Sequence, residues 1–105
     1  MSPTERICGG DDLKVGEARK FILGDLPICL VRTGDGFKAI GDTCSHADYS
    51  LAEGEVDLDF CEIECWKHGS MFSLETGEPT TLPATRPVPV YEVVIDGDDV
   101  SVVLP

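Results

Sequence analysis

The sequence is poor in basic residues and histidine, and it has no long apolar stretch. Its 105 residues include 8 lysines and arginines, 20 aspartates and glutamates and 2 histidines, for a formal net charge of −12. Nucleic acids and anionic membranes repel so acidic a chain, so neither is expected as a partner. Apolar runs such as 27–31 and 100–105 are far too short to span a bilayer. The charge instead favours a protein partner with a basic surface.

The N-terminus and the cysteines indicate a reducing compartment. Residues 1–6 lack the basic-then-apolar layout of a secretory signal, so we expect a cytoplasmic protein. The five cysteines are an odd number, which does not suit a closed disulfide framework. In a reducing compartment, cysteines are more often metal ligands or buried apolar residues. The length predicts a single domain over residues 1–105.

Frequent turn signals predict an all-β fold. The pairs Gly24-Asp25 and Asp96-Gly97 each lie between apolar segments, which is typical of tight hairpins. Residues 78–90 contain four prolines and should form a stiff extended loop. Only residues 47–58 could form a helical turn or two. The strands that we expect are 5–8, 17–23, 26–33, 37–41, 91–95 and 99–104.

Both histidines follow a cysteine closely. The pattern is Cys44-x-His46, then eighteen residues, then Cys65-x-x-His68. Two such loops could close one four-ligand metal site. Tetrahedral zinc is one possible occupant, but zinc fingers usually pair cysteine with cysteine and histidine with histidine. A loop that carries one of each better suits a two-iron cluster in which one iron takes both thiolates and the other both imidazoles.

The two loops resemble those of the Rieske ferredoxins, which read Cys-Thr-His…Ser-Leu…Gly and Cys-x-x-His-Gly. The matching residues here are Cys44-Ser45-His46, Ser50-Leu51…Gly54 and Cys65-Trp66-Lys67-His68-Gly69. The resemblance implies a Rieske fold of antiparallel sheets stacked as a sandwich. It also implies a small cluster-binding subdomain at about 42–72, made of two loops. One [2Fe–2S] cluster per chain would be ligated by Cys44, His46, Cys65 and His68.

The resemblance is to the ferredoxin branch of the family. Respiratory members carry one more cysteine in each loop, joined in a disulfide, and the matching positions here are Tyr49 and Lys67. The implied function is a one-electron carrier, not itself an enzyme, between a flavin-dependent ferredoxin reductase and a terminal non-haem iron oxygenase. The alternatives are an accessory to iron–sulfur assembly, a redox sensor, or a structural zinc domain. A complete oxygenase is not expected, because the two histidines needed for its mononuclear iron are already used.

Several further residues have expected roles around this site. By the resemblance, Ser70 donates its hydroxyl to a bridging sulfide, Phe72 replaces a tyrosine of the high-potential proteins, and the segment with Pro83 covers the cluster. Gly69 should permit a tight turn, and Trp66 either packs in the core or contacts a partner. Cys8, Cys29 and Cys61 are expected to be buried thiols. The acidic residues between 42 and 64 could attract a basic partner; they are Asp42, Asp48, Glu53, Glu55, Asp57, Asp59, Glu62 and Glu64.

Overall fold

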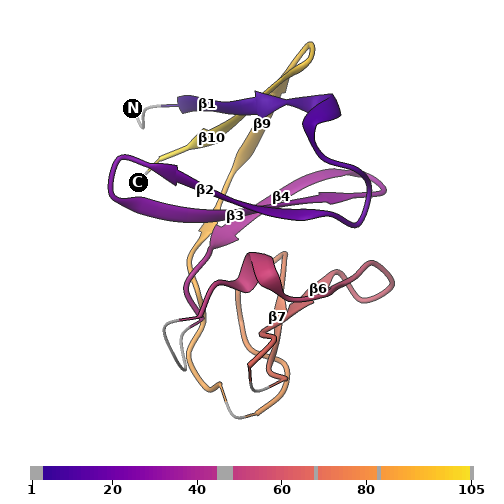
Figure 1. Ribbon diagram of the computed structural model, residues 1–105, viewed down its shortest axis with the longest axis vertical. Helices are drawn as coiled ribbons and strands as arrows, with labels where there is room; N and C mark the ends of the chain where they lie inside the picture. Colours follow the sequence, from indigo (N-terminus) through magenta and orange to yellow (C-terminus); the bar gives the residue numbers. More distant parts are fainter. Residues whose placement is uncertain (1–3, 45–48, 68, 83, 105) are drawn as a thin grey trace.

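The computed structural model describes residues 4–44, 49–67, 69–82 and 84–104, and these form three antiparallel sheets. Figure 1 shows the sheets one below another along the long axis. Within the described residues no helix is long and apolar enough to cross a membrane. The elements are β1 (Thr4–Gly9), η1 (Gly10–Asp12), β2 (Ala18–Leu23), β3 (Leu26–Thr33), β4 (Gly36–Gly41), η2 (Leu51–Glu53), β5 (Val56–Asp57), β6 (Glu62–Glu64), β7 (Met71–Ser73), β8 (Val90–Tyr91), β9 (Val93–Asp96) and β10 (Asp99–Val103).

The first sheet has the order β1-β10-β9 and contains the predicted C-terminal hairpin. Asp96 pairs with Asp99 across the turn, and Gly97 has a φ of 60°, which glycine adopts without steric cost. The predicted strand 91–95 is wrong at its start, because the chain changes sheet there. Tyr91 belongs to β8 and pairs with Ala39 of β4, whereas Val93 of β9 pairs with Val102.

The four-stranded sheet, β2-β3-β4-β8, separates two hydrophobic cores. Successive side chains of a strand point to opposite faces, so the buried residues 28–31 of β3 supply both cores. Ile28 and Leu30 pack in the core shared with the first sheet, and Cys29 and Val31 pack in the core shared with β6 and β7. Burial on both faces explains why β3 is almost continuously apolar.

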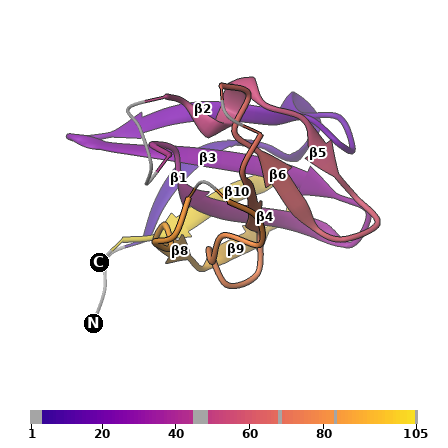
Figure 2. The same cartoon turned by 90° about the horizontal axis from the view of Figure 1, so that it is seen from below.

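The third sheet, β5-β6-β7, forms the other end of the molecule together with two connecting loops (Figures 1 and 2). The helix considered for 47–58 is reduced, among its described residues, to the 3₁₀ turn η2. The chain after η2 lies so close to β6 that only glycine fits at position 54. A Cβ added at Gly54 would lie 1.5 Å from the Glu64 carbonyl oxygen. The described residues of 78–89 form an irregular connection to β8 with bends or turns at Thr81, Leu82 and Arg86, so this segment is not extended throughout as predicted.

Candidate metal centre

The first predicted ligand loop is closed by backbone hydrogen bonds beside Cys44. The Cys44 N–H donates to the Tyr49 carbonyl at 2.9 Å, and Thr43 and Ser50 form an isolated antiparallel bridge. These contacts turn the chain back on itself between residues 44 and 49. His46 falls between Cys44 and Tyr49 in the sequence and lies outside the described residues.

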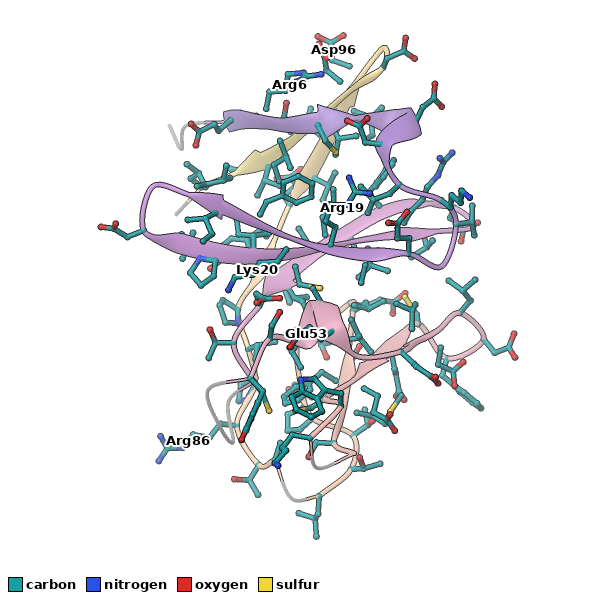
Figure 3. The ribbon with its side chains drawn as sticks, viewed as in Figure 1. Arg6, Arg19, Lys20, Glu53, Arg86 and Asp96 are labelled. Carbon is teal, nitrogen blue, oxygen red and sulfur yellow. The ribbon has the colours of Figure 1, made fainter. Side chains whose placement is uncertain are left out.

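Asp42 anchors this loop to the four-stranded sheet. Its side chain is 1% exposed, and one oxygen accepts hydrogen bonds from the Ser50 hydroxyl at 2.9 Å and the Ala52 N–H at 3.0 Å. The other oxygen lies 3.8 Å from Lys20 Nζ, and Figure 3 shows Lys20 on the side of the sheet that faces the loops. Including Asp42 in a docking surface was therefore wrong, since its charge is buried and used within the fold. Asp48, of the same run, lies outside the described residues.

The second loop is tighter. The Cys65 N–H donates to the Ser70 carbonyl at 2.7 Å, and the Gly69 N–H donates to the Cys65 carbonyl at 2.9 Å. Gly69 has a φ of 77°, which confirms that a glycine is needed for the turn. His68 falls between Cys65 and Gly69 in the sequence and lies outside the described residues.

The structure brings Cys44 and Cys65 into one apolar cluster. They are 3% and 0% exposed and share this cluster with Leu51, Ile63 and Phe72. All five cysteines lie in the described part of the chain, and none forms a disulfide. No group of three His, Cys, Asp or Glu side chains suited to a metal occurs among the described residues, which include neither histidine.

Ser70 connects the second loop to the proline-rich segment. It is fully buried, and its Oγ accepts a hydrogen bond from the Ala84 N–H at 3.1 Å. This bond uses a lone pair of the oxygen, so the hydroxyl hydrogen can be donated to another acceptor. Ala84 and Val88 are themselves buried in the same apolar cluster, so the segment is packed against the loops. Pro83 lies outside the described residues.

The remaining cysteines do not share one environment. Cys8 and Cys29 are buried as predicted, and the burial raises the pKa of both thiols. Cys61 is only partly buried and lies before β6 with a φ of 54°. It packs against the apolar cluster that contains Cys44 and Cys65, so the predicted burial of Cys61 is only partial.

The aromatic residues near the loops divide between core and surface. Phe72 is fully buried, pairs with Ile63 and belongs to the cluster that contains both loop cysteines. Trp66 is 47% exposed, so it does not belong to the core.

Carboxylates line a groove on the third sheet that sequence reasoning did not identify. The groove has a volume of about 530 Å³ and is lined by Glu55, Val56, Asp57, Leu58, Asp59, Glu64 and Met71. The Asp57 carboxylate also accepts hydrogen bonds from the Asp59 and Phe60 N–H groups at 3.0 and 3.2 Å. Asp57 thus shapes the turn between β5 and β6 besides contributing charge.

Known proteins resemble this chain over nearly its whole length. The profile of the family described as "Rieske [2Fe-2S] domain" matches residues 4–92. The ferredoxin component of biphenyl 2,3-dioxygenase from Rhodococcus jostii is 41% identical over 97 residues, 92% of this chain and 89% of that protein. The ferredoxin of carbazole 1,9a-dioxygenase from Nocardioides aromaticivorans superimposes with a TM-score of 0.93 at 38% identity, covering 97% and 98% of the two chains. A ferredoxin solved in complex with reduced carbazole 1,9a-dioxygenase oxygenase superimposes with a TM-score of 0.85 at 39% identity, covering 92% and 98%.

The residues present fit a Rieske cluster. Two buried thiols begin two closed turns in one apolar cluster, and the chain's two histidines follow them in sequence by two and three positions. This donor set is the mixed thiolate and imidazole set of Rieske centres. The chain therefore belongs to the Rieske [2Fe–2S] domain family and carries one Rieske cluster.

Proposed function

We propose that the chain is the ferredoxin of an oxygenase system, working in the cytoplasm. It would accept single electrons from a flavin-dependent ferredoxin reductase and pass them to a terminal non-haem iron oxygenase. The observation that supports this most directly is the similarity, over 92% of the chain, to a ferredoxin solved in complex with an oxygenase. The curated relative of 41% identity is likewise named as a dioxygenase ferredoxin component.

We further propose the ligands. Cys44 and Cys65 would hold one iron, and His46 and His68 the other, within a cluster-binding subdomain at about 42–72 of a single domain. The burial of both thiols in one apolar cluster supports this, because it brings two potential thiolate ligands into one region that excludes water. The closed turns at 44–49 and 65–70 support it too, because each fixes the backbone at a proposed thiolate.

The bound cluster supplies a site that gains and loses one electron. Two ferric irons, two sulfides, two thiolates and two neutral imidazoles sum to zero charge, so the reduced state carries one negative charge. The contribution of the protein is to stabilise that added charge. Ser70 would donate a hydrogen bond toward it, whereas the phenyl ring of Phe72 cannot. We therefore expect a midpoint potential in the lower part of the Rieske range, roughly −150 to 0 mV.

The other functional classes lack a supporting observation of this kind. An accessory to iron–sulfur assembly or a redox sensor would use the same cluster, but the similar proteins named above are dioxygenase components. A structural zinc domain would give colourless protein that contains zinc, whereas a Rieske protein is reddish-brown and contains iron.

Two half-reactions in a stopped-flow instrument test the proposal. The oxidised protein is mixed with the NADH-reduced reductase of the same system, and the reduced protein is mixed with its oxidised oxygenase. Bleaching in the first reaction and recovery of absorption in the second, both faster than overall turnover, would support the carrier role. Rapid reduction without reoxidation by the oxygenase would overturn it and favour a sensor or assembly role.

A further inference from the structure

Three side chains connect the two ligand loops at the surface. The rings of Tyr49 and Trp66 have centroids 5.2 Å apart and cross at 83°, an edge-to-face contact. The Lys67 Nζ lies 5.7 Å from the centre of the Tyr49 ring and 5.8 Å from that of Trp66. We call this group the loop clasp (Tyr49, Trp66, Lys67). Both kinds of contact are attractive beyond simple burial, because the π faces are electron-rich and the ring edges and ammonium are positive.

The loop clasp is attached to the backbone at both buried thiols. Tyr49 accepts the hydrogen bond from the Cys44 N–H that closes the first loop. Trp66 and Lys67 directly follow Cys65 in the second loop. A force that separates the loops must therefore break the clasp. No disulfide links the two loops, since none of the five cysteines, all of which the structure describes, forms one.

We propose that the loop clasp is a non-covalent cross-link that retains the cluster between the loops and places a positive charge beside it. The proposal rests on the proposed ligation by Cys44 and Cys65. Lys67 is two residues from Cys65, so their Cα atoms are within roughly 7 Å. The contacts with the Tyr49 and Trp66 rings hold the Lys67 ammonium beside the two loops, and a cation there favours the reduced state, which has one more negative charge. Tyr49 and Lys67 are thus positioning residues. The Tyr49 ring contacts Trp66 of the second loop and the Lys67 ammonium, and that ammonium stabilises the added negative charge of the reduced cluster.

The competing account is that Trp66 and Lys67 only form part of a partner-binding surface, since both are exposed. The two accounts differ when no partner is present. A surface that only binds partners has no effect on the isolated protein, whereas a cross-link and a local charge do.

The first test is therefore the rate of cluster loss from the isolated holoprotein, followed as bleaching of visible absorption in excess iron chelator. We expect Tyr49→Leu, which removes the ring but keeps apolar bulk, to lose its cluster on the order of fivefold faster than the wild type. Lys67→Gln should lose it faster as well, and Lys67→Arg should restore the wild-type rate. Phe37→Leu is the matched control, because Arg32 lies over the Phe37 ring at 5.5 Å in a similar contact on the four-stranded sheet.

The second test is the midpoint potential of the same variants. Lys67→Gln should lower it and Lys67→Arg should restore it, whereas a purely structural lysine would leave it unchanged.

Three results would overturn the proposal: wild-type rates of loss in both Tyr49→Leu and Lys67→Gln, equal acceleration by Phe37→Leu, or an unchanged potential in Lys67→Gln. A wild-type protein without a Rieske spectrum would instead refute the proposed ligation and would be seen before any variant is made.

Discussion

The substitution Ser70→Ala separates two roles of one buried hydroxyl. The wild-type Oγ is fully buried and accepts a hydrogen bond from the Ala84 N–H at 3.1 Å. Its loss leaves that N–H without this acceptor, and we expect the free energy of unfolding to fall by about 1–3 kcal/mol. This effect requires no cluster.

The second effect of Ser70→Ala concerns the electron. A hydrogen bond to a charged group stabilises a protein by about 1 kcal/mol more than one to a neutral group. A hydrogen bond from Ser70 therefore strengthens when the cluster becomes negative. For a one-electron couple, about 1 kcal/mol corresponds to roughly 40 mV. We therefore expect the midpoint potential of Ser70→Ala to be lower than that of the wild type by about this amount.

Protein-film voltammetry of wild type and variant measures the potential, and thermal unfolding measures the stability. Ser73→Ala is the control, because the Ser73 hydroxyl accepts hydrogen bonds from Glu75 and Thr76 in a turn outside the two ligand loops. Its potential should equal that of the wild type. If Ser70→Ala is destabilised but its potential is unchanged or higher, the hydroxyl serves only Ala84 and our reasoning fails.

Three further predictions concern the fold, a buried thiol and the approach to partners. Gly77→Ala should lower the free energy of unfolding by more than about 2 kcal/mol in thermal unfolding, because Gly77 has a φ of 76° and its Cβ would lie 2.0 Å from the Val88 carbonyl oxygen. Gly34→Ala, with open space around it, should have little effect, and equal losses would contradict this reading. Cys29 should resist alkylation in the native protein, because burial raises the pKa of its thiol. Cys29→Ala should keep the visible spectrum of the cluster. Rapid alkylation of Cys29, or loss of the cluster in Cys29→Ala, would contradict this prediction. The second-order rate constant for reduction by the reductase should fall steeply as the salt concentration rises. At low salt, the same rate constant should fall when the exposed Glu53 and Glu55 are changed to Gln. A rate constant that responds to neither change would exclude electrostatic steering.

Most strands of the first two sheets were predictable because their turns are encoded locally, whereas the short strands β5 and β7 of the third sheet were not predicted. Gly24 and Gly97 have φ values of 65° and 60°, and each lies between apolar segments that pair across it. The change of sheet at Tyr91 was not predictable, because β4, the partner of Tyr91, is distant in sequence, whereas the partner of β9 is its hairpin neighbour β10. A local pattern shows that a segment is extended but not which strand it pairs with.

The site was predictable in its residues more than in its contacts. The spacing of cysteine and histidine indicated the two loops, and the structure closes both by hydrogen bonds from the Cys44 and Cys65 N–H groups. The buried role of Asp42 was missed, because the Lys20 and Ser50 that hold it come from other segments. The contact of Tyr49 with Trp66 was missed for the same reason, since it exists only once the two loops are packed together.

The central claim is that both histidines bind the cluster, and the chain offers a direct test because it has only those two. Protein grown with ¹⁵N-histidine as its sole nitrogen label is reduced and measured by pulsed electron paramagnetic resonance. Two strongly coupled ¹⁵N nuclei would identify His46 and His68 as ligands of the reduced cluster. Only one coupled nucleus, or none, would contradict the ligand assignment on which the account rests.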